Sequence, residues 1–264
     1  MQHSGGIMTK TTVSRAQQRQ AVIKQYPLTY PLALIGGGLL IGILLGFRLF
    51  SSSESGYAVN LYTTLIDVGL TVGVIEVLSR RRDAQRANRE RLQELITQMG
   101  SKDNGLAIAA VEILRLRGWL YDGSLQGAYL YYANLEGADL GSVHLTGANL
   151  IGAHLTGANL IGAHLEGARL GSANLQGVNL DGSHLQRTHL IGAHLEGANL
   201  GSAHLQGAHL SGAHLTGVNL GSAHLTGVNL IGAQFDEHTT LPDGTQWTPD
   251  TNMTCFTDPA HPQF

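Results

Sequence analysis

The sequence predicts a mainly β protein in which very short strands coil and stack on one another, preceded by a pair of transmembrane helices. Three observations lead to this fold class. A large apolar residue occupies every fifth position from Leu120 to Phe235, a charge-free run covers residues 25–47, and a weaker apolar run covers residues 57–78. A five-residue period fits neither an amphipathic helix nor a plain strand, so the repeat decides the fold.

Charge is unevenly distributed along the 264 residues. Residues 1–118 carry 14 Lys/Arg against 8 Asp/Glu, whereas residues 119–264 carry 2 against 11. The charged fraction of 13% is low beside the average of roughly 25%. The single cysteine, Cys255, excludes an internal disulfide framework and a Cys-rich zinc site.

The first apolar run predicts a retained transmembrane helix over about residues 28–50. A bilayer needs roughly 20 apolar residues, and this run is long enough. It follows a basic tail, residues 1–24, that contains no acidic residue, and Arg48 marks its other edge. A cleaved signal peptide is the competing interpretation, but the apolar core is too long for one.

The second run, about residues 57–78, predicts the other helix of a hairpin, although Asn60, Asp67 and Glu76 interrupt it. Basic residues precede the first helix and follow the second. The positive-inside rule therefore places both termini and the repeat domain in the cytoplasm. We expect a multi-pass protein of the cell membrane.

Small residues repeat at four-residue spacing along both predicted spans. Such residues let helices approach closely in lipid, within the hairpin or between copies of the chain. Asp67 lies near the middle of the second span, where we expect a protonated residue that joins helices by a hydrogen bond; a proton or ion relay is the alternative. The predicted membrane-packing residues are Gly38, Gly42, Gly46, Asp67, Gly69 and Gly73.

Each repeat unit reads small–polar–Leu followed by two residues that often include glycine, as in Ala-Asn-Leu-Glu-Gly at 133–137. The first three residues predict a short strand whose side chains point in, out and in. The next two can turn a corner, because glycine accepts backbone angles that other residues avoid. Coils built in this way would hydrogen-bond to one another at a spacing of about 4.8 Å.

Units such as ADLGS, ANLIG and AHLTG make about 120 residues of this sequence resemble the pentapeptide repeat family, as a membrane-anchored bacterial member. The resemblance implies a right-handed, four-sided parallel β-helix with four units in each coil. The 23 units centred from Leu125 to Phe235 would then give nearly six coils. Some members of the family resemble B-DNA in charge and inhibit type II topoisomerases.

Four units per coil place residues twenty apart above one another, so the outward polar positions sort into four columns. One column is rich in amides, one is all histidine and two are mixed. The amide column is Asp139, Asn159, Asn179, Asn199 and Asn219, and the histidine ladder is His144, His164, His184, His204 and His224.

Histidine takes ten of the outward places, where the family usually has Asp or Asn. Stacked imidazoles could share a transition metal or sense pH. A flat face, however, offers only two or three nitrogens in poor geometry and no obvious second shell. We therefore predict no cofactor and no metal site, with the five ladder histidines as weak metal candidates.

Two further features lie on the coil corners. The pair Arg187-Thr188 replaces the usual Gly-Ala and is expected to mark a slight bulge or only drift in the sequence. The exposed residues Ile151, Ile191 and Ile231 fall forty apart on one corner, too dispersed to predict a binding patch.

The sequence shows no catalytic constellation, since it has neither a nucleophile with an orienting His–carboxylate pair nor a phosphate-binding loop. We predict a non-enzymatic, membrane-tethered scaffold that binds an unknown protein partner or another copy of itself. A metal- or pH-responsive sensor is the alternative. DNA mimicry ranks lower and nucleic acid is not an expected partner, because mimicry needs dense negative charge.

The segment after Phe235 is predicted to cover the last coil, because an open β-helix end would present unpaired strand edges. Leu241, Trp247 and Phe256 supply apolar cover. The predicted domains are the basic tail 1–24, the transmembrane hairpin 25–79, the juxtamembrane helices and N-terminal cap 80–118, the repeat domain 119–235 and the C-terminal cap 236–264.

Overall fold

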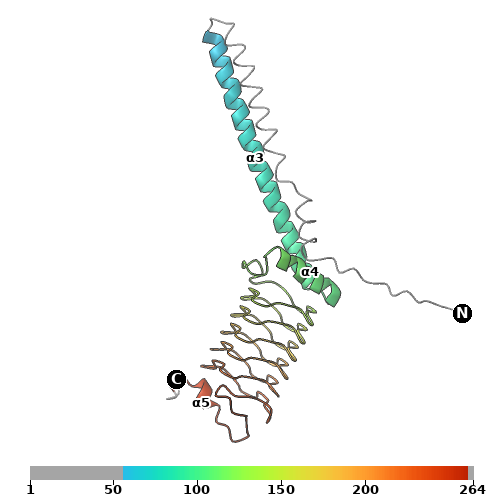
Figure 1. The fold of residues 1–264 in the computed structure, drawn as a ribbon, viewed down its shortest axis with the longest axis vertical. Coiled ribbons are helices and arrows are strands. Elements are labelled where there is room, and N and C mark those ends of the chain that lie inside the picture. The colour runs from blue at the N-terminus through green and yellow to red at the C-terminus, as the bar shows by residue number, and fades with distance from the viewer. Residues whose placement is uncertain (1–55, 261–264) are drawn as a thin grey trace, which may run out of the picture. The chain divides into compact units, whose positions relative to one another are not determined.

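The computed structural model describes residues 56–260, with side chains from residue 64 onward. Within these residues it contains helices α3 (Gly56–Met99), α4 (Asn104–Leu116) and α5 (Thr254–Thr257), and a stack of coils between α4 and α5 (Figure 1). The chain divides into two compact units, Met1–Gln85 and Arg86–Phe264.

Helix α3 is continuous over 44 residues. Strong helix formers fill its second half, and no glycine or proline interrupts residues 79–99. Ion pairs one turn apart support it: Arg86 Nε lies 2.9 Å from Glu90 Oε1, and Arg91 lies 2.6 Å from Glu94. The second predicted span therefore runs without a break into the predicted juxtamembrane helix.

No helix among the described residues has the length and apolarity needed to cross a membrane. In α3 the apolar residues are diluted by Asn60, Asp67 and Glu76, whereas a spanning helix needs roughly 20 predominantly apolar residues. The structure therefore contradicts the predicted transmembrane hairpin and, with it, the multi-pass localisation in the cell membrane with a cytoplasmic repeat domain. The first predicted span, residues 28–50, lies outside the described residues.

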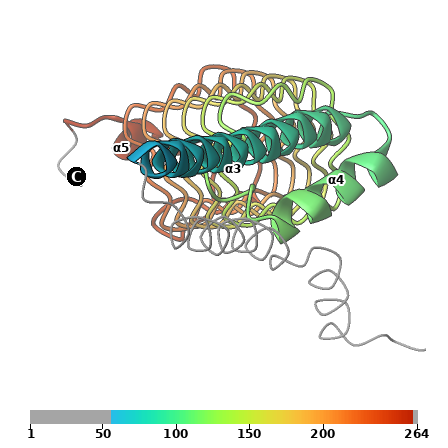
Figure 2. The same ribbon diagram turned by 90° about the horizontal axis from the view of Figure 1, so that it is seen from above.

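The repeat domain is a parallel β-helix whose coils are twenty residues long. Parallel bridges join residues twenty apart, from Tyr129↔Asn149 through His214↔Gln234. Backbone hydrogen bonds run between coils at each bridge; for example, the Leu150 amide donates to the Arg169 carbonyl at 2.7 Å. Four such columns follow one another along the chain, so the predicted four-sided coil is confirmed (Figure 2).

The interior of the β-helix consists of leucine and small side chains. The leucines from Leu120 to Leu225 are at most 2% exposed, and from Leu130 onward the small residue two positions earlier is also buried. From Leu125 onward the backbone turns the corner two residues after each of these leucines with a positive φ, as at Gly157 (φ 65°). Glycine reaches this conformation without the steric cost that a Cβ atom brings.

The pair Arg187-Thr188 does not disturb the coil. Arg187 adopts φ 57°, close to the value of the corner glycines. Thr188 is fully buried in the place of alanine, and its hydroxyl donates to the Leu165 carbonyl at 2.9 Å. The predicted bulge is therefore absent, because the threonine hydroxyl finds an acceptor inside the wall.

Helix α4 closes the N-terminal end of the β-helix. The Asp103 side chain caps the helix by accepting from the Leu106 amide at 2.9 Å. The buried side of α4 joins the leucine core, together with Leu95 and Met99 from the end of α3. Figure 2 shows α4 beside the first, green coils. The buried residues of α4 are Ala107, Ala110, Val111 and Leu114.

The segment after Phe235 covers the other end. Thr240 pairs in parallel with Asn219 and in antiparallel fashion with Gln246, which extends the ladder by a partial coil. The rings of Phe235 and Trp247 stack with centroids 5.8 Å apart. Leu241 is buried, and Met253 and Phe256 pack against the core.

Candidate functional site

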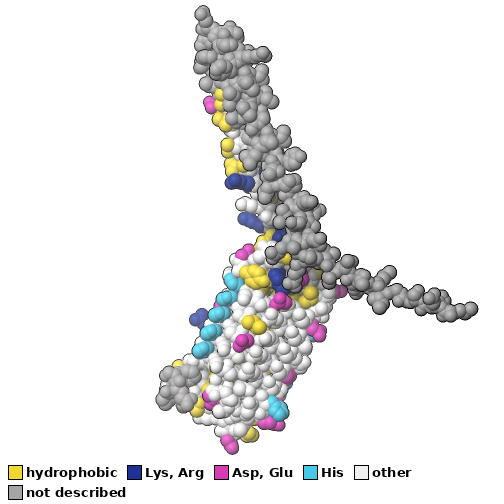
Figure 3. Space-filling model, in the orientation of Figure 1, with side chains coloured by type: hydrophobic (Ala, Val, Ile, Leu, Met, Phe, Trp, Pro, Cys, Tyr) yellow, Lys and Arg dark blue, Asp and Glu magenta, His cyan; other side chains and the backbone are white. Residues whose placement is uncertain are grey.

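The outward side chains form straight columns along the β-helix, and a row of histidines follows one face (Figure 3). Within the histidine ladder, the rings of His164 and His184 are parallel to within 2° and 4.6 Å apart between centroids. The stacking continues to His204 at 5.0 Å and from there to His224 at 4.9 Å. At the other end His144 meets His164 edge-on, at 4.5 Å and 71°.

Histidines also stack in the two mixed columns. His189 and His209 lie 5.1 Å apart, and His194 and His214 lie 4.6 Å apart, with ring planes within 13° in both pairs. The β-helix therefore presents stacked imidazoles on three of its four faces. The column of His194 is two units away from the ladder, on the opposite face of the four-sided coil.

Two glutamates stand beside stacked histidines in equivalent positions. Glu166 Oε1 lies 3.2 Å from His164 Nδ1. Glu196 Oε1 lies 3.2 Å from His194 Nδ1 and 3.8 Å from His214 Nδ1. In each group of two histidines and one glutamate, the potential metal-ligand atoms all lie within 4.8 Å of one another.

The two carboxylates are held by similar surroundings. Burial raises the pKa of Glu166, but its own backbone N–H, His164 and the Thr146 hydroxyl lower the pKa more, so it lies below its usual value. Burial likewise raises the pKa of Glu196, and its backbone N–H, His194 and Gln176 outweigh that effect. Both side chains are therefore anionic at neutral pH.

The pKa of the ladder histidine His204 also lies below its usual value, which in a histidine favours the uncharged form. Burial lowers its pKa first, and the positive charge that His224 or His184 carries when protonated lowers it further. Protons on neighbouring rings of the stack therefore oppose one another. The lowered pKa of His204 favours its uncharged imidazole, which keeps a free nitrogen lone pair.

The amide column has a structural role. Asn159 Nδ2 donates to Asp139 Oδ1 at 2.9 Å, and Asn219 Nδ2 donates to Asn199 Oδ1 at 3.0 Å. The other side-chain atom of Asn219, Oδ1, accepts from the Gly221 amide at 2.9 Å, and this bond stabilises the corner. These side chains form hydrogen bonds to the next coil and to the corner that follows them, so their polar atoms already have partners.

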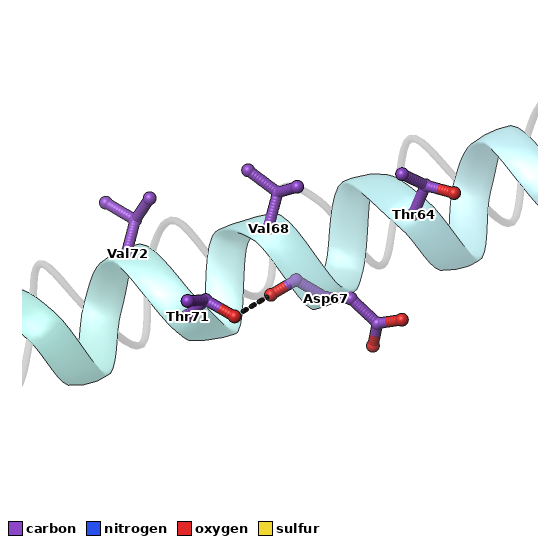
Figure 4. A pocket seen from close by; sticks show the side chains of 5 residues that line it. All are labelled: Thr64, Asp67, Val68, Thr71 and Val72. Carbon is purple, nitrogen blue, oxygen red and sulfur yellow. Dashed lines mark hydrogen bonds between the residues drawn. The ribbon is translucent and has the colours of Figure 1, made fainter.

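The predicted membrane-packing residues that the structure describes lie on α3. The Thr71 hydroxyl donates to the Asp67 carbonyl at 2.7 Å, while the Asp67 carboxylate points away from the helix (Figure 4). No described atom lies within 4 Å of a Cβ built on Gly69 or Gly73. Gly38, Gly42 and Gly46 lie outside the described residues. Membrane packing by these six residues remains untested, and the membrane span that it assumed is contradicted.

The sequence pattern predicted the ladder and placed His194 and His214 in one of the mixed columns, but the two glutamates beside these histidines were missed. The prediction compared only the outward residue in the middle of each strand, whereas the glutamates occupy the corner two residues later. The signal was present as His-Leu-Glu followed by a histidine twenty residues after the first, at 164–166 with His184 and at 194–196 with His214.

Comparison with known proteins agrees with the repeat geometry. The family model described as pentapeptide repeats matches the chain in eight copies, over residues 122–147, 138–177, 168–207 and 203–237. The search of curated proteins found no match.

Solved structures of pentapeptide repeat proteins are also similar. Rfr23 from the cyanobacterium Cyanothece 51142 is 41% identical over 38% of this chain and 64% of its own, with a TM-score of 0.30. HetL from Nostoc sp. strain PCC 7120, a protein involved in heterocyst differentiation regulation, is 33% identical over 46% of this chain and 71% of its own, with a TM-score of 0.25.

QnrB1, a plasmid-mediated fluoroquinolone resistance protein, is 21% identical over 44% of this chain and 62% of its own, with a TM-score of 0.35. The chain thus spans less than two thirds of the QnrB1 and Rfr23 structures. Since every TM-score lies below 0.5, the family assignment depends on the repeat model and on sequence identity, not on superposition.

Proposed function

Because this chain belongs to the pentapeptide repeat family, we propose that its β-helix is a non-enzymatic scaffold that binds another protein through one long edge. The interior leucines are buried and the same in every unit, so they carry no information about a partner. Recognition depends on the outward residues, which differ from face to face.

The observation that carries the proposal is an exposed apolar edge. In one column of units the residues that follow the leucine are Tyr131, Ile151, Gly171, Ile191, Ser211 and Ile231; Tyr131, Ile191 and Ile231 are exposed and Ile151 is half-buried. Ile191 is 51% exposed and Ile231 is 77% exposed. The Tyr132 amide donates to the Ile151 carbonyl at 3.1 Å, which fixes these residues above one another. The isoleucines alone are too dispersed for a patch, but the exposed Tyr131 at the start of the same edge extends them, and apolar surface that continues along one edge favours a contact with another protein.

The face beside this edge has the composition of a binding surface. Tyr129 is 67% exposed at its start, and Arg169 follows two coils later in the same column. Tyrosine and arginine are enriched at protein interfaces and among the residues that contribute most to binding. The rings of Tyr129 and Tyr131 lie 6.0 Å apart, so the face and the edge meet in one aromatic cluster.

A catalytic role receives no support from the most polar cluster of the repeats. The Thr146 hydroxyl donates to Glu166 Oε2 at 2.9 Å, and Glu166 Oε1 contacts His164. The carboxylate therefore lies between the hydroxyl and the imidazole. The hydroxyl–imidazole pair that activates a nucleophile in a Ser–His arrangement needs the imidazole to contact the hydroxyl directly, and here the carboxylate separates the two, so the cluster does not have that arrangement.

The charge of the repeats supports a protein partner over DNA mimicry. From Leu125 to Phe235 the sequence carries Glu136, Asp139, Glu166, Asp181 and Glu196, offset by Arg169 and Arg187. A mimic of the phosphate backbone needs a dense, continuous negative surface.

The test is photo-crosslinking in living cells with a photoreactive amino acid at Ile191 of the full chain. We expect a discrete protein adduct, and its mass distinguishes a second copy of this chain from a different protein. The control places the same amino acid at Asp181, a corner position in a different column. Adducts of equal yield and pattern at the two positions, or none at Ile191, would contradict the proposal.

A further inference from the structure

Two groups of side chains on opposite faces of the β-helix share one composition and one spacing. Each consists of a histidine, a glutamate two residues later, and the histidine that stacks above the first one coil on. The second group begins thirty residues after the first, at His194 instead of His164. We propose that each group binds one zinc ion, so that the chain carries two equivalent zinc sites.

The ligand chemistry matches zinc. Zinc in proteins is bound by histidine nitrogen and carboxylate oxygen at about 2.0–2.2 Å, and sets of two histidines and one glutamate are known with water in the fourth position. In a tetrahedron of that size, ligand atoms are about 3.4 Å apart. Glu196 Oε1 lies 3.2 Å from His194 Nδ1 and 3.8 Å from His214 Nδ1, close to that spacing.

The proton balance of binding is simple. A neutral imidazole carries one proton, which can reside on either ring nitrogen. When zinc binds His194, the Nδ1 lone pair coordinates the metal and the ring proton resides on Nε2. No oxidant or further reactant is needed, and zinc itself undergoes no redox change.

In the first site, a residue of the coil below already orients the glutamate. The Thr146 hydroxyl donates to Glu166 Oε2 at 2.9 Å, which leaves Oε1 facing His164. His184 stacks above His164, and its ligand nitrogen lies within 4.8 Å of the ligand atoms of His164 and Glu166. Such outer contacts fix the direction of a ligand and raise metal affinity.

In the second site one carboxylate oxygen has no hydrogen-bond donor. Glu196 Oε2 is buried and has no partner at hydrogen-bond geometry among the described residues; the Gln176 side chain, in the position that Thr146 takes below Glu166, is close enough to lower the pKa of Glu196 but does not complete such a bond. A buried oxygen without a donor is destabilising. A bound cation at Glu196 would supply the missing partner charge.

The other stacked histidines of the described residues lack the carboxylate. His189 and His209 stack at 5.1 Å, but Ile191 and Ser211 follow them at the corners. His204 and His224 are followed by Gln206 and Thr226. The proposal therefore does not extend to the whole ladder, because two imidazoles on a flat wall leave a zinc ion with too few protein ligands.

The experiment is isothermal titration calorimetry of the untagged full chain with zinc chloride at pH 7.5. We expect two equivalents per chain and none with magnesium chloride, since magnesium prefers oxygen ligands. Glu166→Gln and Glu196→Gln should each weaken one equivalent by about tenfold or more. Both variants keep the shape of the side chain, and thermal unfolding without metal verifies that the fold is retained.

The matched control is the double variant His189→Asn and His209→Asn, which removes a stacked pair without a glutamate and should leave two equivalents. A second test replaces the upper ligands, His184→Asn and His214→Asn, and should remove the same equivalents with both glutamates intact. Zinc stoichiometry and affinity unchanged by the glutamate variants, or no zinc binding at all, would overturn the proposal.

Discussion

The two ends of the β-helix are closed by different kinds of contact. At the N-terminal end the apolar side of α4 packs on the first coils, with Leu114 fully buried. At the C-terminal end Leu241 is buried too, but a partial coil is held in addition by hydrogen bonds around Asp236 and Thr239. One stack of strands can therefore be covered mainly by packing, which is insensitive to pH, or by packing together with a charged anchor, whose contribution depends on pH.

The anchor at the C-terminal end is one carboxylate oxygen. Asp236 Oδ1 accepts from the Gly217 amide at 2.7 Å and from the His238 amide at 3.2 Å. The Thr239 hydroxyl lies 3.0 Å from the same oxygen and 2.8 Å from the Leu215 carbonyl of the coil below. The Gly217 amide is the main reason why the pKa of Asp236 lies below its usual value.

Deletion of residues 236–264 should have the largest effect. It removes the strand pairing at Thr240 and the ring of Trp247 over Phe235, and so exposes the edge of the last coil. Open β edges pair with other chains, so we expect aggregates in size-exclusion chromatography with light scattering. A truncation of residues 261–264 alone is the control and should elute like the full chain. A monodisperse 1–235 protein would show that this end needs no cover.

Leu114→Ala should come next and tests the packed end. Loss of a fully buried leucine leaves a cavity and costs about 2–5 kcal/mol of unfolding free energy. The neighbouring Leu116 is 84% exposed, so Leu116→Ala should change the free energy by less than about 0.5 kcal/mol. Urea unfolding at neutral and at acidic pH provides the measurement, and the Leu114→Ala loss should be the same at both. Equal losses for the two variants would contradict the packing role of α4.

Asp236→Asn should have the smallest effect on stability of the three changes, and its effect alone should depend on pH. The folded pKa of Asp236 lies below the unfolded value of about 3.9, so the fold favours the carboxylate form. Its contribution is therefore present above that value and is lost as the pH falls through the folded pKa. We expect a lower melting temperature at pH 7 and little difference from the parent chain once both are acidified.

The control for this anchor is Asp250→Asn, which removes an exposed carboxylate from the same cap. It should leave the melting temperature unchanged across the pH range. If Asp236→Asn and Asp250→Asn gave the same pH profile, the C-terminal end would be held by packing like the N-terminal one.

The sequence predicted the features that depend on spacing alone. Leucine at every fifth position gave the buried wall, and the twenty-residue step placed His164 above His144 and below His184, as the bridges confirm. The place of Glu166 beside His164 was missed, because it depends on how the corner after Leu165 turns the next side chain. Corner geometry follows from backbone angles, which the repeat pattern does not specify.

The membrane prediction failed because of the composition of residues 57–78. These residues were expected to span a membrane although Asn60, Asp67 and Glu76 interrupt them, and residues 79–99 were expected to continue the same helix. Residues 79–99 are strong helix formers, so α3 continues to Met99 as one helix. Asp67 and Glu76 dilute its apolar content, and composition over a short window did not weigh them sufficiently.

The twenty-residue coil also governs how this protein can change by insertion or deletion. Removal of a whole coil leaves every later residue on its own face. Removal of one five-residue unit rotates everything after it by a quarter turn; a unit lost between Glu166 and His184 would bring His189 above His164 in its place. The interior would accept this change, because all units share the same leucine. The number of units therefore decides which side chains share a face. Loss or gain of a single unit changes the composition of every face beyond that point and leaves the leucine core the same.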